Sequence, residues 1–184
     1  MPVSFWVFFS LVTVYLVVLS WWDIRYRRLP NILTLGGALV ALAYVFYASG
    51  WSWGWLGRSF LGGVIGFTFL LIPFLLRGAG AGDVKMLFAV GCIVGYPNIF
   101  MALVWISLCG IVLGLAMTIS GHLDWARVKH YTRCLIDFRY DKVQGKASLP
   151  DASQEKVRIP YGVAIASGTW LTMAISVWQR FQNL

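Results

Sequence analysis

Charge is scarce in this sequence, and acidic residues are the scarcest of all. Of 184 residues, only 15 are Lys or Arg and only 7 are Asp or Glu, so charged residues make up 12% of the chain. Soluble domains carry about twice that share, roughly 25%. So few charges cannot cover a water-facing surface. Apolar residues supply 59% of the chain and the mean hydropathy is +0.74, which predicts a membrane protein.

The sequence also lacks paired cysteines and a basic nucleic-acid module. Its three cysteines, Cys92, Cys109 and Cys134, form no Cys-x-x-Cys motif, so neither a disulfide framework nor a zinc site is indicated. The net charge is +8, but membrane proteins concentrate such an excess in their cytoplasmic loops. We therefore predict a partner in membrane lipid and no nucleic acid.

Long, nearly continuous apolar runs predict transmembrane helices, because the strands of a membrane barrel alternate apolar and polar residues. A bilayer core of about 30 Å needs roughly 20 apolar residues per helix. We expect an all-α, polytopic membrane helix bundle of about six transmembrane helices, with the whole chain 1–184 as one domain. The expected spans are 4–22, 32–49, 56–76, 84–96, 99–120 and 159–179.

Glycine and proline give two of these spans a distinctive pattern. Gly62 and Gly66 form a GxxxG pair, which favours close helix packing. Pro97 ends the span 84–96 early, leaving about 20 Å of helix against a core of roughly 30 Å. The start of that span should therefore lie below the membrane surface, with Asp83 partly buried. A small-residue face on the last span, which includes Gly162, is likewise explained by helix packing.

The cations predict the orientation of the bundle. If the N-terminus is outside, the cytoplasmic connections hold 13 of the 15 cations, and only Arg58 and Arg180 lie elsewhere. This distribution follows the positive-inside rule. We expect both termini to be extracytoplasmic, with a cytoplasmic loop at 121–158. The first apolar run precedes its basic residues, so we expect a transmembrane helix there and not a cleaved signal peptide.

Asp23 and Asp83 are the two acids at membrane boundaries, whereas the other five lie in the polar stretch 121–158. An ionisable side chain at such a depth is costly and suggests a functional site. Both aspartates fall on the cytoplasmic side in the expected topology. Two neighbouring carboxylates share a proton, so one can deprotonate a water while the other polarises a carbonyl. The pair thus indicates aspartic-protease chemistry.

Each aspartate by itself also has a structural interpretation. Asp23 could form an ion pair with an arginine of the segment 25–28, and Asp83 could cap the helix that follows it. A small transporter that uses the two aspartates as proton or cation sites is an alternative function, although interrupted helices in matching halves, which would favour it, are not evident. A non-catalytic subunit of a pilus or secretion assembly is another.

The segments around the aspartates together resemble the type IV prepilin peptidases, which are GxGD-type intramembrane aspartyl proteases. These segments are Asp23-Ile-Arg-Tyr-Arg-Arg-Leu-Pro-Asn31 and Gly80-Ala-Gly-Asp-Val-Lys85. Ile-Pro-Tyr-Gly at 159–162 resembles the proline-glycine start of the family's last helix. The resemblance covers essentially the whole chain. It implies that Asp23 and Asp83 are catalytic, in a multi-pass protein of the bacterial inner membrane.

The resemblance also implies a substrate. This would be a type IV prepilin or pseudopilin, with a short basic leader in the cytoplasm and one apolar helix in the bilayer, cleaved after a glycine at the membrane boundary. No cofactor or metal would be needed. Larger members carry a methyltransferase domain with paired CxxC motifs, which this sequence lacks. It is similar to the short, peptidase-only TadV or CpaA type of tight-adherence (Tad/Flp) pili, for which we expect no N-methylation.

Five further residues are expected to support the site: Gly80, Gly82, Lys85, Arg25 and Asn31. The two glycines would permit backbone angles closed to other residues, or would let a peptide lie alongside the aspartates; a flexible linker is the alternative. Lys85 could act on the two aspartates, meet an acidic residue of the substrate, or simply lie at the interface. The sequence does not predict an oligomeric state.

Overall fold

The computed structural model describes residues 3–26, 29–75, 79–120 and 161–182, and these residues form six helices and no strand. The all-α prediction is therefore confirmed. In chain order the helices are α1 (Val3–Tyr26), α2 (Asn31–Ala48), α3 (Trp53–Leu75), α4 (Ala81–Val94), α5 (Ile99–Ile119) and α8 (Tyr161–Gln182). The expected loop at 121–158 lies outside the described residues.

Five of these helices are long and apolar enough to cross a membrane, and α4 is the exception. With 14 residues, α4 measures about 21 Å, so the short fourth helix is confirmed. It is also the most enclosed helix, because α2, α3 and α8 pack around it. Its side chains Met86, Leu87 and Val90 are completely buried. Since protein surrounds α4, its length need not match the bilayer.

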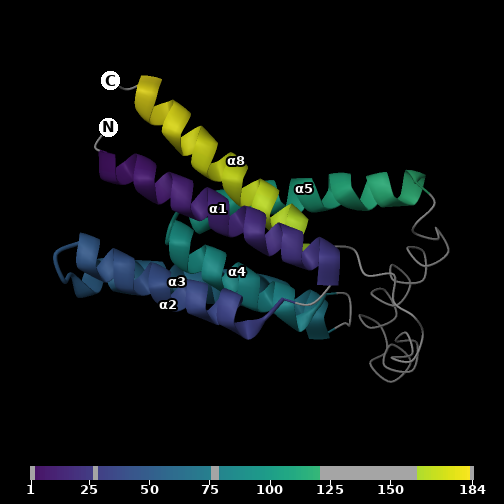
Figure 1. Ribbon diagram of the computed structural model, residues 1–184, viewed down its shortest axis with the longest axis horizontal. Helices are drawn as coiled ribbons and strands as arrows, with labels where there is room; N and C mark the ends of the chain where they lie inside the picture. Colours follow the sequence, from purple (N-terminus) through teal and green to yellow (C-terminus); the bar gives the residue numbers. More distant parts are fainter. Residues whose placement is uncertain (1–2, 27–28, 76–78, 121–160, 183–184) are drawn as a thin grey trace, which may run out of the picture.

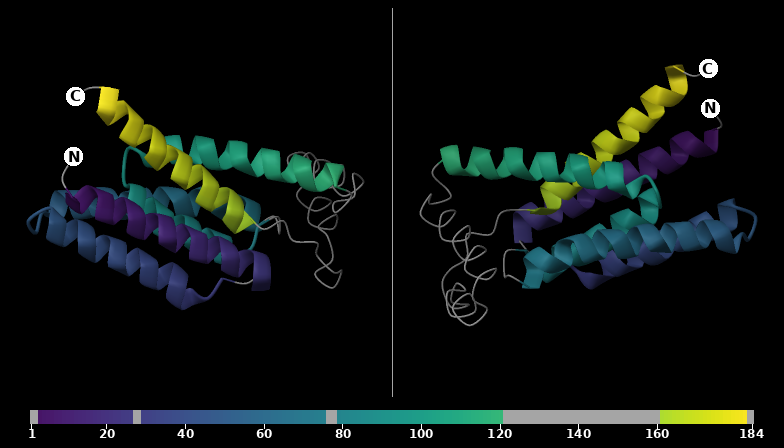
Figure 2. Two further views of the ribbon diagram at one scale, coloured as in Figure 1. Left: turned by 45° about the horizontal axis from the view of Figure 1, so that its top comes forward. Right: turned by 180° about the vertical axis from the view of Figure 1, so that it is seen from behind.

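Consecutive helices alternate in direction, so the bundle has two ends (Figures 1 and 2). The end of α1, the start of α2, the end of α3 and the start of α4 meet at one of them. We call this the aspartate end, because Asp23 lies in the last turn of α1 and Asp83 in the first turn of α4. The start of α1 and the end of α8 lie at the opposite end (Figure 1).

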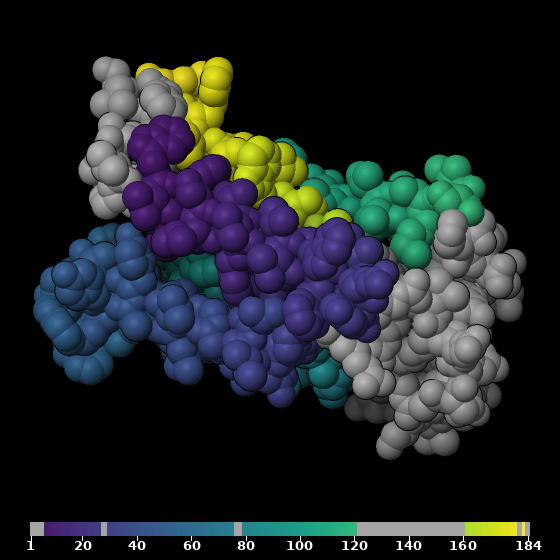
Figure 3. All heavy atoms as spheres, in the orientation of Figure 1, coloured from purple at the N-terminus to yellow at the C-terminus, as the bar shows by residue number. Residues whose placement is uncertain are grey.

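Side by side, α1 and α8 cover one face of the bundle, and part of α4 is visible in the space between α1 and α2 (Figure 3). On the other side of α4, glycines set the contact with α3. A Cβ atom on Gly62 would lie 2.5 Å from the carbonyl oxygen of Gly91, and one on Gly66 would lie 2.7 Å from that of Leu87. The two backbones therefore touch, which confirms the packing predicted from the GxxxG pair.

Two helix boundaries near the aspartates differ from the prediction. Helix α1 was expected to end at Trp22 but continues through Asp23 to Tyr26, and α4 begins at Ala81 instead of after Asp83. The expected ends were set where apolar residues stop. Apolarity marks the extent of the bilayer, whereas a helix continues as long as its internal hydrogen bonds do. As a result, both aspartates lie inside helices.

Candidate active site

Asp23 is buried in the last turn of α1, with 6% of its surface exposed. Its Oδ2 accepts a 2.8 Å hydrogen bond from the backbone N–H of Gly162, the second residue of α8. The first N–H groups of a helix have no partner within that helix, and they carry its partial positive charge. The start of α8 is therefore well suited to hold a carboxylate, and here it holds one that lies 139 residues away in the sequence.

Asp83 is the third residue of α4 and is partly buried, as predicted. Its Oδ2 accepts a 3.0 Å hydrogen bond from the backbone N–H of Gly80, the residue that precedes the helix. The carboxylate thus satisfies a backbone donor at the start of its own helix. The capping role considered for Asp83 is present, but the cap position itself belongs to Gly80. One oxygen of each aspartate is therefore bound by a backbone N–H.

The start of α8 lies at the aspartate end. Gly162, the second residue of α8, binds Asp23, and Tyr161 is the first residue of the helix. The hydroxyl oxygen of Tyr161 also lies 3.4 Å from the position of a Cβ on Gly110 of α5. The N-terminus of α8 thus holds Asp23, and the other carboxylate, 60 positions later in the sequence (83 − 23), is bound at the start of α4.

Gly162 contributes its backbone to the site, a role that sequence reasoning missed. A Cβ on Gly162 would lie 2.7 Å from Oδ2 and 3.0 Å from Cγ of Asp23. Any side chain would therefore occupy the space of the carboxylate. In the sequence this glycine was attributed to helix packing. The sequence feature that could have indicated this role is the position of Gly162 directly after Pro-Tyr, where the last helix begins.

The expectation that Gly80 and Gly82 adopt unusual backbone angles is wrong. Gly80 has an extended backbone (φ −85°, ψ 149°), and Gly82 is helical. Both positions are instead short of space. A Cβ on Gly80 would lie 3.1 Å from Oδ2 of Asp83, and one on Gly82 would lie 3.1 Å from the Cβ of Leu29. The glycines let Asp83 fold back on its own helix and let the segment before α2 approach α4.

Two of the other expected supporting residues meet directly. The Lys85 ammonium donates a 2.8 Å hydrogen bond to Oδ1 of Asn31, which joins the first turn of α4 to the first residue of α2. Arg25 is exposed in the last turn of α1. Asp23 is buried, and the structure gives it a backbone partner in α8.

The described segments contain no cluster of three or more His, Cys, Asp or Glu side chains that could hold a metal ion. The chemically active groups at the aspartate end are the two carboxylates, the N–H of Gly162 and the hydroxyl of Tyr161. Two carboxylates that lie close together can share a proton and exchange it with a water. The chain is a polytopic membrane helix bundle, and the two acids among its described residues lie at one end of it.

Comparison with known proteins names the family. Residues 10–115, more than half of the chain, match the type IV leader peptidase family. The matched region contains Asp23 and Asp83 but ends before α8. No curated protein and no solved structure shows significant similarity to the chain. The chain belongs to the type IV leader peptidase family, so it is a multi-pass membrane protease of the prepilin-processing kind.

Proposed function

We propose that this protein is an intramembrane aspartyl endopeptidase in which Asp23 and Asp83 cut the leader from a type IV prepilin. Membership of the family supports leader peptidase activity in general. The observation that supports these two residues is their position at one end of the bundle, where the N–H of Gly162 at the start of α8 holds Asp23 and Asp83 lies in the first turn of α4. No other described residue of this chain is an Asp or Glu.

The proposed reaction uses one shared proton and one water. The ionised carboxylate takes a proton from the water, whose oxygen attacks the carbonyl carbon of the scissile bond. The protonated carboxyl donates its proton to the carbonyl oxygen. The tetrahedral intermediate collapses when the carboxyl that took the water's proton gives it to the amide nitrogen and the C–N bond breaks. The other carboxylate takes a proton from a hydroxyl of the intermediate, which restores the starting state of the pair. The backbone N–H groups of Gly162 and Gly80 each bind one carboxylate oxygen, which orients the remaining oxygens for this exchange.

Charge placement supports a cytoplasmic location for this reaction. Arg25 and Lys85 lie at the aspartate end, whereas Arg58 lies in the first turns of α3 at the opposite end. The positive-inside rule then makes the aspartate end cytoplasmic and puts the start of α1 and the end of α8 outside. The protein would lie in the inner membrane of a bacterium. The leader of a prepilin is on the same, cytoplasmic side.

The connection between α1 and α2 supports a peptidase without a methyltransferase insertion at this point. Helix α1 ends at residue 26 and α2 begins at residue 31, which leaves only the four positions 27–30 (30 − 27 + 1) between them. A domain cannot be inserted in so short a connection. We therefore assign the chain to the peptidase-only kind that serves Tad/Flp-like pili. Its chemistry needs two carboxylates and a water, with no cofactor or metal.

Replacement of either carboxylate by an amide tests the proposal. Asn has the shape of Asp and can still accept the N–H bond, but it neither carries nor exchanges the proton. Asp23→Asn and Asp83→Asn should each reduce prepilin cleavage by at least about 10³-fold, because each removes a general acid–base group. Ser176→Ala, which removes a hydroxyl near the far end of α8, is the control.

The assay measures cleavage per folded molecule in detergent, with and without a zinc chelator. All three variants should insert and unfold like the wild type, and the chelator should leave the rate unchanged. Near-wild-type cleavage by either Asn variant would refute the shared-proton mechanism.

A further inference from the structure

Arg58 is a charged side chain that the proposed reaction does not use. Away from the aspartate end, it is the only charged residue in the five described helices that could span a membrane. It lies five residues into α3 from Trp53, or about 7.5 Å along the helix, and its side chain is exposed. An ionisable side chain inside a membrane span is costly unless it has a partner. Arg58 therefore needs an anion.

The described part of the chain offers Arg58 no such anion. Its only acids, Asp23 and Asp83, lie at the aspartate end, whereas Arg58 lies in the first turns of α3 at the opposite end (Figure 1). The guanidinium instead lies over the ring of Trp55, 5.2 Å from the ring centroid. The ring attracts the cation but carries no net charge. The counter-charge of Arg58 thus comes from outside the described residues.

The start of α3 is fastened to α4 and to the connection that follows α4. The carbonyl oxygen of Arg58 accepts a 3.0 Å hydrogen bond from the backbone N–H of Tyr96. The next residue, Ser59, is buried, and its hydroxyl donates a 2.5 Å hydrogen bond to the carbonyl oxygen of Cys92 in α4. These bonds occupy the inner side of α3. The side chains of Arg58 and Trp55, one turn apart, are left on its exposed side.

The surface around Arg58 combines aromatic side chains with open space. Trp53 and Trp55 are 76% and 56% exposed, and tryptophan favours the headgroup level of a bilayer. A Cβ on Gly57 would meet nothing within 4 Å. Leu61, one turn beyond Arg58 toward the middle of α3, is also exposed. The cation thus has room beside it, with aromatic rings toward the helix start and apolar surface toward the bilayer core.

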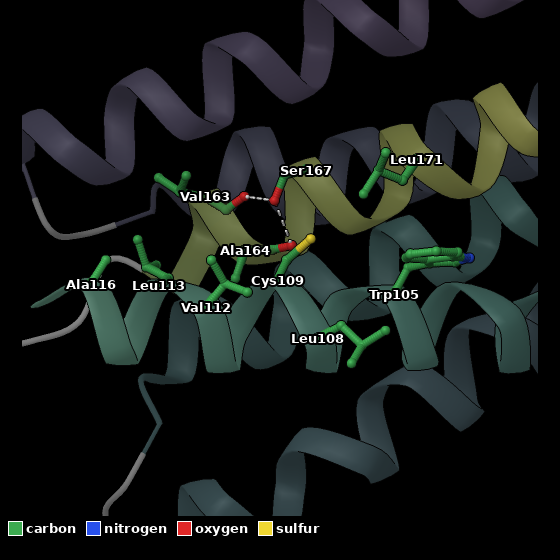
Figure 4. Close-up of a pocket in the computed structure, with 10 residues that line it drawn as sticks. All are labelled: Trp105, Leu108, Cys109, Val112, Leu113, Ala116, Val163, Ala164, Ser167 and Leu171. Carbon is green, nitrogen blue, oxygen red and sulfur yellow. Dashed lines mark hydrogen bonds between the residues drawn. The ribbon is translucent and has the colours of Figure 1, made fainter.

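The apolar groove between α5 and α8 is a surface of the opposite character (Figure 4). It has a volume of about 430 Å³, and no charged residue lines it. The hydroxyl of Ser167 in its wall is already bonded to carbonyl oxygens of α8. Nothing in that groove needs an anion. Among the described lipid-facing surfaces, the need for a charged headgroup belongs to Arg58.

We propose that Arg58 binds the phosphate of a phospholipid, with Trp55 beside the headgroup and the acyl chains running along α3 past Leu61. A guanidinium presents a fork of N–H donors that matches two oxygens of a phosphodiester. The long arginine stem lets the charged group reach headgroup level from within the span. Phospholipid phosphates surround the bundle at that level. The bound lipid neutralises Arg58 and holds the start of α3 at the membrane surface.

The test titrates the full-length protein in detergent with phosphatidylglycerol and counts bound lipids by native mass spectrometry. Diacylglycerol with the same acyl chains is the control lipid, because it lacks the phosphate. Arg58→Gln removes the charge, and Arg58→Lys keeps it without the fork. Trp55→Leu removes the ring beside the cation. Trp53→Leu is its matched control, because the ring of Trp53 packs on Phe46, with 5.1 Å between centroids.

The wild type should bind the first phosphatidylglycerol at least about tenfold more tightly than diacylglycerol, because hydrogen bonds between charged groups are the stronger kind. Arg58→Gln should weaken phosphatidylglycerol binding about tenfold and leave diacylglycerol binding unchanged. Arg58→Lys should weaken phosphatidylglycerol binding only about threefold, because the charge remains. Trp55→Leu should also weaken it about threefold, through the lost contact with the cation. Trp53→Leu should bind both lipids like the wild type.

Three results would overturn the phosphate site. They are equal affinity of the wild type for the two lipids, unchanged phosphatidylglycerol binding by Arg58→Gln, and an equal loss in the two Trp variants. If Arg58→Gln does not fold in detergent, the lipid comparison and the Trp pair decide the outcome without it. The assay contains no prepilin, so its result is independent of leader cleavage.

Discussion

Gly162→Ala offers a sharp test of how Asp23 is positioned. The new Cβ would lie 2.7, 3.0 and 3.1 Å from Oδ2, Cγ and Cβ of Asp23, all of them side-chain atoms. Ordinary contact begins at 3.4 Å, so the carboxylate must move by about 0.7 Å (3.4 − 2.7). The substitution therefore shifts the carboxylate while leaving the helix contacts in place.

We expect Gly162→Ala to lower the rate of catalysis. Displacing a reacting group by about 1 Å can cost on the order of 10²-fold in rate. Weakening the 2.8 Å bond from the Gly162 N–H removes a hydrogen bond to a charged acceptor, typically worth about 1.5–3 kcal/mol. Both effects act on the same oxygen and cannot simply be added. We expect kcat to fall by roughly 30- to 100-fold, with KM changed by less than about threefold.

Two other glycines provide the controls. A Cβ on Gly168, further along α8, would lie 2.5 Å from backbone atoms of Ile106, so Gly168→Ala should lower thermal stability and folded yield. Gly114→Ala meets open space and should change neither property. The assay is leader cleavage per folded molecule in detergent, with thermal unfolding measured on the same samples. A Gly162→Ala protein with wild-type kcat would show that the observed position of Asp23 is not the catalytic one.

Three further predictions concern the aspartate end and the topology. Gly82→Ala would place a Cβ 3.1 Å from Leu29 and should lower cleavage about tenfold in folded protein. Gly66→Ala would place a Cβ 2.7 Å from the backbone of α4 and should instead lower the melting temperature. Equal losses of fold and activity in both variants would make Gly82 an ordinary packing residue. Lys85→Met removes the 2.8 Å hydrogen bond to Asn31 and should reduce cleavage by about three- to tenfold. The double variant Lys85→Met with Asn31→Leu should cleave at the same rate as Lys85→Met alone. Additive losses of activity would show that the two side chains act separately. A reporter fused to the C-terminus should be active only outside the cytoplasm, and cytoplasmic activity would reverse the assigned orientation.

The bundle itself could be predicted because a bilayer leaves the backbone few choices. Every N–H and C=O in hydrocarbon needs an internal partner, so a continuous apolar run becomes a helix whatever its neighbours are. For the same reason the short fourth helix could be predicted from Pro97, and the contact between α3 and α4 from Gly62 and Gly66. These features depend on residues close together in the chain, where spacing determines geometry.

The chemistry of the two carboxylates could also be inferred from the sequence, because ionisable residues at membrane depth are few and costly. Their surroundings could not. Asp23 is bound by a residue 139 positions later, and Lys85 meets Asn31 across 54 positions. Such partners depend on how the helices are arranged around one another. The backbone angles expected at Gly80 and Gly82 were wrong for this reason, since the lack of space at both positions comes from atoms that the fold brings near them.

The amino-acid sequence by itself thus determined the class of protein, the approximate spans of the described helices and the identity of its two membrane-boundary acids. Only the tertiary structure decided that α8 begins against the end of α1, so that the N–H of Gly162 donates its hydrogen bond to Asp23. The physical reason is the range of the interactions. Helix formation in a bilayer is governed by hydrogen bonds between residues four apart. The site, in contrast, depends on how the helices pack against one another, which a local sequence pattern does not predict.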